Sequence, residues 1–171
     1  MNTKTKNLVI AGLLTALGIA IPQLFHLVGM SGSVFLPMHI PVLLCGIICG
    51  PTLGGLCGLL VPLLCGLLTG MPPLFPVATY MACELIAYGV IIGFMFKKTN
   101  VFVSLITAML GGRVVLGIAQ AVCMGIVSKP FGIPAFLTGA FVTALPGIVI
   151  QLVLIPAIIL LLKKTKVLQG A

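Results

Sequence analysis

Two ionisable residues within long apolar stretches of the sequence are the first candidates for chemistry. Glu84 is the only acidic residue of the chain, and Arg113 is its only arginine. If these stretches cross a membrane, each charge is costly, so it either pairs with an opposite charge or contacts a polar substrate. The sequence leaves both interpretations open: the two side chains neutralise one another, or at least one of them binds a ligand.

The residues around Glu84 and Arg113 predict a polar pocket. Tyr80, Glu84 and Tyr88 are spaced i, i+4 and i+8, so they share one helix face. Arg113 and Gln120 are seven residues apart and share a face of the next helix. With a rise of about 1.5 Å per residue, Glu84 and Gln120 lie roughly 10 Å below the outer helix ends, and Arg113 lies roughly 20 Å below them. We therefore expect Glu84 and Gln120 to line a substrate pocket, with Arg113 at its floor. The two tyrosines either line the same pocket or anchor the helix at the membrane interface.

Three other polar residues are weaker candidates. His39 begins an apolar segment directly after a Gly- and Ser-rich stretch, so ligand contact and anchoring of that loop are both open. His26 lies near the end of the first apolar segment, where an interfacial position without a specific role is favoured. Gln151 is polar at the middle of the last segment, and its type alone does not decide its role.

Enzymatic, metal and cofactor chemistry have little support in the sequence. An enzyme needs a nucleophile with a base, or grouped metal ligands, and neither pattern is present. The cysteines lie inside apolar segments without a C-x-x-C pair, so we expect them to pack as small apolar side chains. They are Cys45, Cys49, Cys57, Cys65, Cys83 and Cys123. No phosphate-binding G-x-x-x-x-G-K-[ST] loop is present, so no ATP hydrolysis by that route is expected.

The composition describes a membrane protein. The chain has 171 residues, of which 61% are hydrophobic and 6% charged, and its mean hydropathy is +1.38. Soluble domains are roughly 25% charged. The formal net charge of +8 comes from lysines clustered between apolar runs. Such clusters are typical of cytoplasmic loops beside a membrane and do not indicate nucleic-acid binding.

The apolar segments and the lysines together predict the topology. Four segments reach the roughly 20 residues that a spanning helix needs, whereas residues 39–70 contain Gly50-Pro51 in their middle, a pair that breaks helices. Folding 39–70 as a hairpin places every lysine except Lys129 on one side, as the positive-inside rule prefers. We therefore predict an all-α integral membrane bundle, one domain over 1–171, with both termini cytoplasmic. Its six helices are expected at 8–28, 39–50, 52–70, 77–96, 101–127 and 133–162.

The outward-facing connections are the long ones in this topology. Residues 29–37 are rich in Gly and Ser, 70–76 contain three prolines, and 128–132 form a short third loop. Functional residues are concentrated on loops that a rigid scaffold positions. We therefore expect the binding site in the outer half.

A stripe of small residues follows one face of the first helix. Gly12, Ala16 and Ala20 are spaced i, i+4 and i+8, which lets a second helix approach closely within a membrane. That second helix belongs either to a partner protein or to the same bundle.

Several short motifs together resemble a transporter family. Besides Ala16-x-x-x-Ala20, they are the segments Leu36–Pro41 (LPMHIP), Gly50-Pro51 and Thr69–Pro73 (TGMPP). In combination they are similar to the substrate-binding S component of energy-coupling factor (ECF) vitamin transporters, in particular the group that shares one energising module. The resemblance implies that the small-residue face of helix 1 docks on a coupling transmembrane subunit. It also implies a site on the outer half between helices 4 to 6, where Glu84, Gln120 and Arg113 fall.

The resemblance and the residues together give the expected function. The chain is expected to bind a small water-soluble vitamin at the bacterial plasma membrane and to deliver it, by rotating in the bilayer, to the coupling subunit and two ATPases. Arg113 favours a carboxylate such as pantothenate, because a guanidinium binds a carboxylate through two hydrogen bonds. If Arg113 instead pairs with Glu84, a neutral pyridoxine- or pyrimidine-type substrate fits equally well. The alternative function is a secondary transporter that works without an ATPase.

Overall fold

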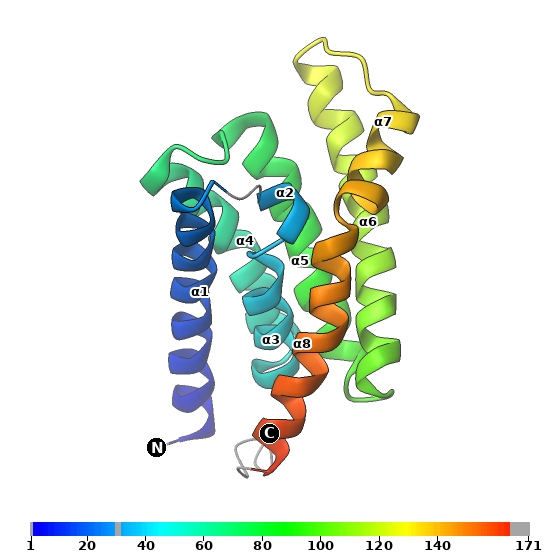
Figure 1. Ribbon diagram of the computed structural model, residues 1–171. Helices are drawn as coiled ribbons and strands as arrows, with labels where there is room; N and C mark the ends of the chain where they lie inside the picture. The colour runs from blue at the N-terminus through cyan, green and yellow to red at the C-terminus, as the bar shows by residue number, and fades with distance from the viewer. Residues whose placement is uncertain (1, 30–31, 165–171) are drawn as a thin grey trace.

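The computed structural model describes residues 2–29 and 32–164, and it confirms the predicted all-α membrane bundle (Figure 1). Six of its helical segments are long and apolar enough to cross a membrane. The elements in chain order are α1 (Thr3–Leu27), α2 (Gly32–Phe35), α3 (His39–Cys49), α4 (Pro51–Thr69), η1 (Leu74–Ala78), α5 (Thr79–Met95), α6 (Val101–Ile126), α7 (Ile133–Leu137), η2 (Thr138–Thr143) and α8 (Leu145–Lys164). Lys166, which contributed to the topology prediction, lies outside the described residues.

The turn between α3 and α4 has the hairpin form that the sequence predicts. Gly50 has φ 91°, a conformation that L side chains rarely adopt, and its N–H donates to the carbonyl of Gly46. Pro51 follows as the first residue of α4, where a helix does not need the missing N–H. These two residues therefore end one helix and begin the next without a loop.

Glycines bring α3, α4 and α5 into direct backbone contact at the centre of the bundle. A Cβ added to Gly54 would lie 2.6 Å from the Cα of Gly46, and one added to Gly89 would meet the carbonyl oxygen of Gly54. In a membrane, helix association depends on such close packing because lipid is as apolar as the helix surfaces. The helices α3, α4 and α5 are therefore held in one fixed arrangement.

We expect Gly89→Ala to destabilise the bundle, because the new methyl group would overlap the backbone of Gly54. Overpacking costs about 1–3 kcal/mol, which corresponds to a fall of roughly 2–12 °C in the melting temperature of a chain of this size. The measurement is thermal unfolding of the purified protein in detergent. Gly125→Ala is the matched control, since a Cβ there would meet nothing within 4 Å. Equal melting temperatures for the two variants would contradict the close packing.

The last predicted helix needs a correction. One helix was expected over 133–162, but the structure divides this stretch into α7, η2 and α8, and only α8 has the length of a span. Prolines explain the division, because Pro134 is the second residue of α7, and Pro146 is the second residue of α8, just after the break at Ala144. A proline lacks the N–H that would continue the preceding helix and restricts the residue before it. The shorter elements α7 and η2 then lie at the end of the bundle where the connection after α6 is found.

The two ends of the bundle differ in charge. The start of α1, the turn between α5 and α6, and the end of α8 lie at one end, and the connections after α1, α4 and α6 lie at the other (Figure 1). Lys4, Lys97, Lys98 and Lys163 belong to the first end, whereas Lys129 belongs to the second. This arrangement agrees with the charge pattern from which the topology was predicted.

Candidate functional site

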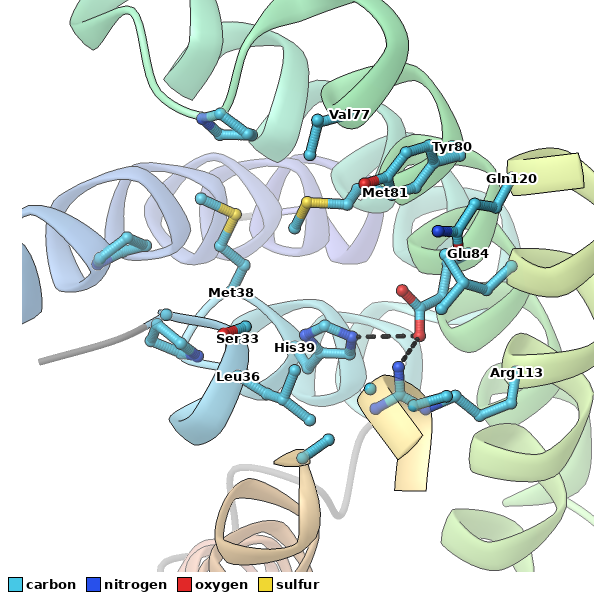
Figure 2. A pocket seen from close by; sticks show the side chains of 18 of the residues that line it. Ser33, Leu36, Met38, His39, Val77, Tyr80, Met81, Glu84, Arg113 and Gln120 are labelled. Atoms are coloured by element: carbon cyan, nitrogen blue, oxygen red, sulfur yellow. Dashed lines mark hydrogen bonds and ion pairs between the residues drawn. The ribbon is translucent and has the colours of Figure 1, made fainter. Parts of the chain in front are cut away.

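A cavity of about 450 Å³ lies at the end of the bundle with the long connections. Its walls come from α1, α2, the start of α3, η1, α5, α6, α7 and η2, and from the loops before α3 and after α4 (Figure 2). The lining residues are Pro22, His26, Gly32, Ser33, Leu36, Pro37, Met38, His39, Met71, Pro72, Pro73, Val77, Tyr80, Met81, Glu84, Arg113, Leu116, Gln120, Ala135, Phe136, Gly139, Ala140 and Ala144.

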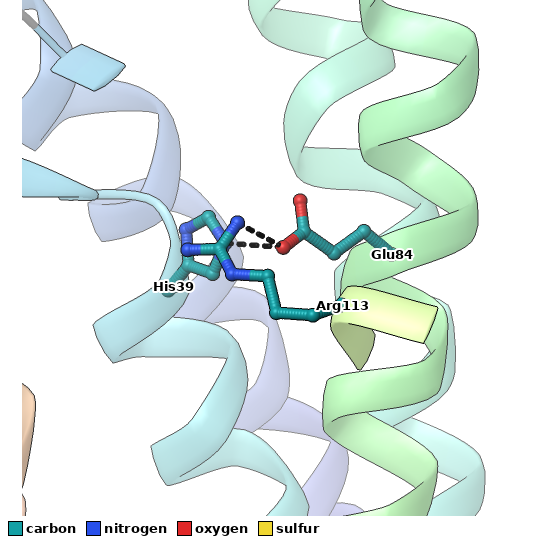
Figure 3. Close-up of polar contacts among 3 residues, drawn as sticks. All are labelled: His39, Glu84 and Arg113. Atoms are coloured by element: carbon teal, nitrogen blue, oxygen red, sulfur yellow. Dashed lines mark hydrogen bonds and ion pairs between the residues drawn. The ribbon is translucent and has the colours of Figure 1, made fainter. Parts of the chain in front are cut away.

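Glu84, Arg113 and His39 form a buried polar group in the lining of this cavity, and Figure 3 shows the contacts among them. Arg113 Nη1 donates to Glu84 Oε1 at 2.7 Å. His39 Nε2 lies 3.5 Å from the same oxygen, without the alignment of a hydrogen bond. The three residues are only 1–5% exposed. Glu84 and Arg113 thus pair with one another and also line the cavity.

Several polar atoms of this group have no partner within the described parts of the chain. They include Arg113 Nε and Nη2 and His39 Nδ1, all of them buried. Glu84 Oε2 points away from Arg113 into the cavity (Figure 2). Buried polar groups in proteins nearly always have hydrogen-bond partners, so each exception needs an explanation. A polar ligand in the cavity would supply the missing partners.

The other predicted site residues divide into two groups. Tyr80 and Gln120 are half-buried, line the cavity, and lie beside Glu84 (Figure 2). Tyr88 is 1% exposed and is not part of the lining; its ring packs edge-on against His39, with 5.0 Å between the ring centroids. The prediction that Tyr88 lines the pocket therefore needs correction. Tyr88 packs against His39 and helps to hold the imidazole in position.

Some lining residues were not among the predicted site residues. Met38, Met71 and Met81 contribute thioether side chains to the cavity, and His26, for which no specific role was favoured, lines it as well. Met81 could have been predicted from the sequence, because it lies three residues from Glu84 and so shares its helix face. The place of Phe136 in the cavity lining could not be predicted from the sequence, since it depends on the break before α8.

Gln151 is buried away from the cavity. It is 1% exposed, and neither of its amide atoms has a hydrogen-bond partner among residues 2–29 and 32–164. Gln23 is a useful contrast, because its amide donates to Cys65 Sγ at 3.2 Å and to Thr69 Oγ1 at 3.4 Å. Gln151 therefore carries a desolvation cost that Gln23 does not.

We expect Gln151→Leu to leave the stability of the protein unchanged or to raise it. An unsatisfied buried polar group costs about 1–3 kcal/mol, and leucine of similar size removes it. Gln23→Leu is the control and should lower the melting temperature in detergent, because it breaks two contacts between α1 and α4. A fall in stability for Gln151→Leu as large as that for Gln23→Leu would show that Gln151 has a partner after all.

The small-residue stripe of α1 faces away from the bundle. Gly12, Ala16 and Ala20 are exposed, and a Cβ added to Gly12 would meet nothing within 4 Å. The opposite face packs inward, and there a Cβ on Gly18 would lie 2.7 Å from Val61 Cγ2. The sequence left open whether the stripe packs against a helix of this bundle or against a helix of a partner protein. Among the described residues, no helix of this bundle packs against it.

A family model for the substrate-specific component of ECF transporters matches residues 6–159. The chain belongs to this family. Neither a curated protein nor a solved structure matches it. As an ECF substrate-specific component, it is a multi-pass membrane protein with a small-molecule substrate and with the ECF module as its partner. The family is a class of transporter subunits and not of enzymes.

Proposed function

We propose that this ECF component captures a small water-soluble vitamin or vitamin precursor at the outer face of the bacterial plasma membrane. The cavity with its buried polar group is the observation that carries the proposal. Small-molecule sites are typically clefts of roughly 300–1,000 Å³, mostly apolar, with a few precisely placed polar groups. The cavity of about 450 Å³ fits this description.

In this proposal, the polar residues of the cavity bind the polar end of the substrate. Glu84, Arg113 and Gln120 orient the polar end of the substrate, with Tyr80 and His39 beside them. The pairing of Arg113 with Glu84 at 2.7 Å removes the reason for preferring pantothenate over a pyridoxine- or pyrimidine-type molecule. The proposed substrates therefore include all three types.

Delivery is proposed to occur through the ECF module, made of one coupling membrane subunit and two ATPases. The exposed stripe of Gly12, Ala16 and Ala20 is the proposed docking surface, because small residues let a partner helix approach closely. The lysine-bearing end is proposed to face the cytoplasm. The whole subunit would rotate in the bilayer and turn its cavity inward, while ATP is hydrolysed by the partner.

Uptake by reconstituted liposomes tests this function. The protein alone should bind one vitamin-type molecule, detected by native mass spectrometry, and should transport nothing. With the coupling subunit and ATPases added, uptake should appear and should require ATP. Uptake into liposomes that contain this chain alone would contradict the proposal and support the autonomous secondary transporter instead.

A further inference from the structure

The charges that line the cavity balance one another, and this balance bears on the chemical class of the substrate. Among the described residues that line the cavity, Glu84 carries a negative charge and Arg113 a positive charge. Two histidines, His26 and His39, also line it. With neutral histidines the lining has no net charge. The inference below rests on the proposed function, because it concerns the ligand of the same cavity.

The free oxygen of Glu84 requires a hydrogen-bond donor from the ligand. Oε1 already accepts from Arg113 Nη1 at 2.7 Å, whereas Oε2 points into the open part of the cavity (Figure 2). An ionised carboxylate is an acceptor only. A hydroxyl or N–H group is therefore complementary to Oε2, and a second carboxylate at this position would be repelled.

The positive charge of Arg113 is engaged with Glu84. Both side chains are at most 6% exposed, so water screens their interaction little. A carboxylate ligand would have to compete with Glu84 for the guanidinium, and it would bring an uncompensated negative charge into a buried site, which is unfavourable. A neutral ligand leaves the ion pair intact. Its hydroxyl oxygen can in addition accept from Arg113 Nη2, which has no partner in the described chain.

The opposite side of the cavity is apolar and soft. Met38 and Met81 lie on the side away from Arg113, with Val77 next to them (Figure 2). Thioether side chains adapt to irregular shapes and make favourable contacts with aromatic rings. This side suits the less polar part of a ligand, either a ring or a short branched chain.

We propose that the substrate is a neutral molecule without a carboxylate, which donates a hydroxyl or N–H hydrogen bond to Glu84 Oε2 and packs its less polar part against Met38 and Met81. The proposal narrows the vitamin types above. It favours alcohol and amide forms over the corresponding acids.

Matched ligand pairs test this charge selectivity. Pyridoxine and 4-pyridoxate differ in a hydroxymethyl group against a carboxylate, and so do panthenol and pantothenate. Binding to the purified protein is measured by calorimetry and native mass spectrometry, together with identification of any molecule that co-purifies. The hydroxymethyl member should bind at least about tenfold more tightly, or the co-purified molecule should be neutral with an O–H or N–H donor. Tighter or equal binding of an acid, or a co-purified carboxylate, would overturn the inference but leave the proposed function standing. If no small molecule binds in any of these measurements, the proposed function fails, and the inference fails with it.

Glu84→Gln tests the same idea from the protein side. The change removes the only negative charge of the lining and leaves Arg113 free, so the preference within each pair should move toward the acid by at least about tenfold. Glu84→Gln/Arg113→Gln is the second variant, because it removes both charges and leaves no ion uncompensated. It should bind the two members of a pair with similar affinity. An unchanged preference in both variants would show that the charges do not select the ligand.

Discussion

Arg113→Ala is expected to destabilise the protein severely and to abolish ligand binding. Glu84 is 2% exposed, and among the described residues it accepts a 2.7 Å hydrogen bond from Arg113 and lies 3.5 Å from His39. Removing one partner of a buried ion pair leaves the other charge uncompensated, at a cost of about 3–5 kcal/mol. Glu84→Ala should act in the same direction, because it leaves the Arg113 guanidinium alone.

Thermal unfolding in detergent and ligand binding measured on the same samples check this prediction. For a chain of this length, the expected loss corresponds to a melting temperature lower by roughly 6–20 °C. Glu84→Gln/Arg113→Met is the matched control: replacing both charges with neutral groups of similar size is often tolerated, so it should melt near the wild-type temperature. Wild-type stability of both alanine variants would contradict the buried pair. Unchanged ligand affinity in both would exclude Glu84 and Arg113 from the site.

The second large effect is expected at the outer face of α1. Ala16→Trp should abolish co-purification with the ECF coupling subunit and leave ligand binding unchanged. Ala16 is exposed between Gly12 and Ala20, so an indole ring there has room in the isolated protein. The same ring would hold a partner helix away from the close approach that small residues permit.

Affinity purification of the assembled complex from membranes measures this effect. Val114→Trp is the matched control, because Val114 is 63% exposed on α6, outside the proposed docking surface, and its replacement should leave assembly intact. Assembly of the Ala16→Trp variant at the wild-type level would refute the docking surface. Loss of ligand binding without loss of assembly would show that this face of α1 serves the cavity instead.

Much of the architecture follows from the sequence because bilayer thickness sets helix length. Apolar runs of about 20 residues predict spans directly, and Gly50-Pro51 marks the one hairpin for which the hydropathy alone is ambiguous. The lysines then select an even number of crossings. Part of the candidate site could also be predicted from the sequence. Glu84 and Arg113 are charged in segments where charged groups are costly, so their types alone identify them as candidates.

Other features depended on contacts between helices that are distant in the sequence. In a soluble helix, alternation of polar and apolar residues shows which face is buried, but here lipid-facing and bundle-facing residues are both apolar. The sequence could therefore not show that Gly12 faces outward and Gly18 inward, or that Tyr80 lines the cavity whereas Tyr88 packs behind His39. It likewise could not show that Glu84 accepts a hydrogen bond from Arg113. The direction in which each of these side chains points depends on the tilt and rotation of its helix, and packing against neighbouring helices determines that tilt and rotation.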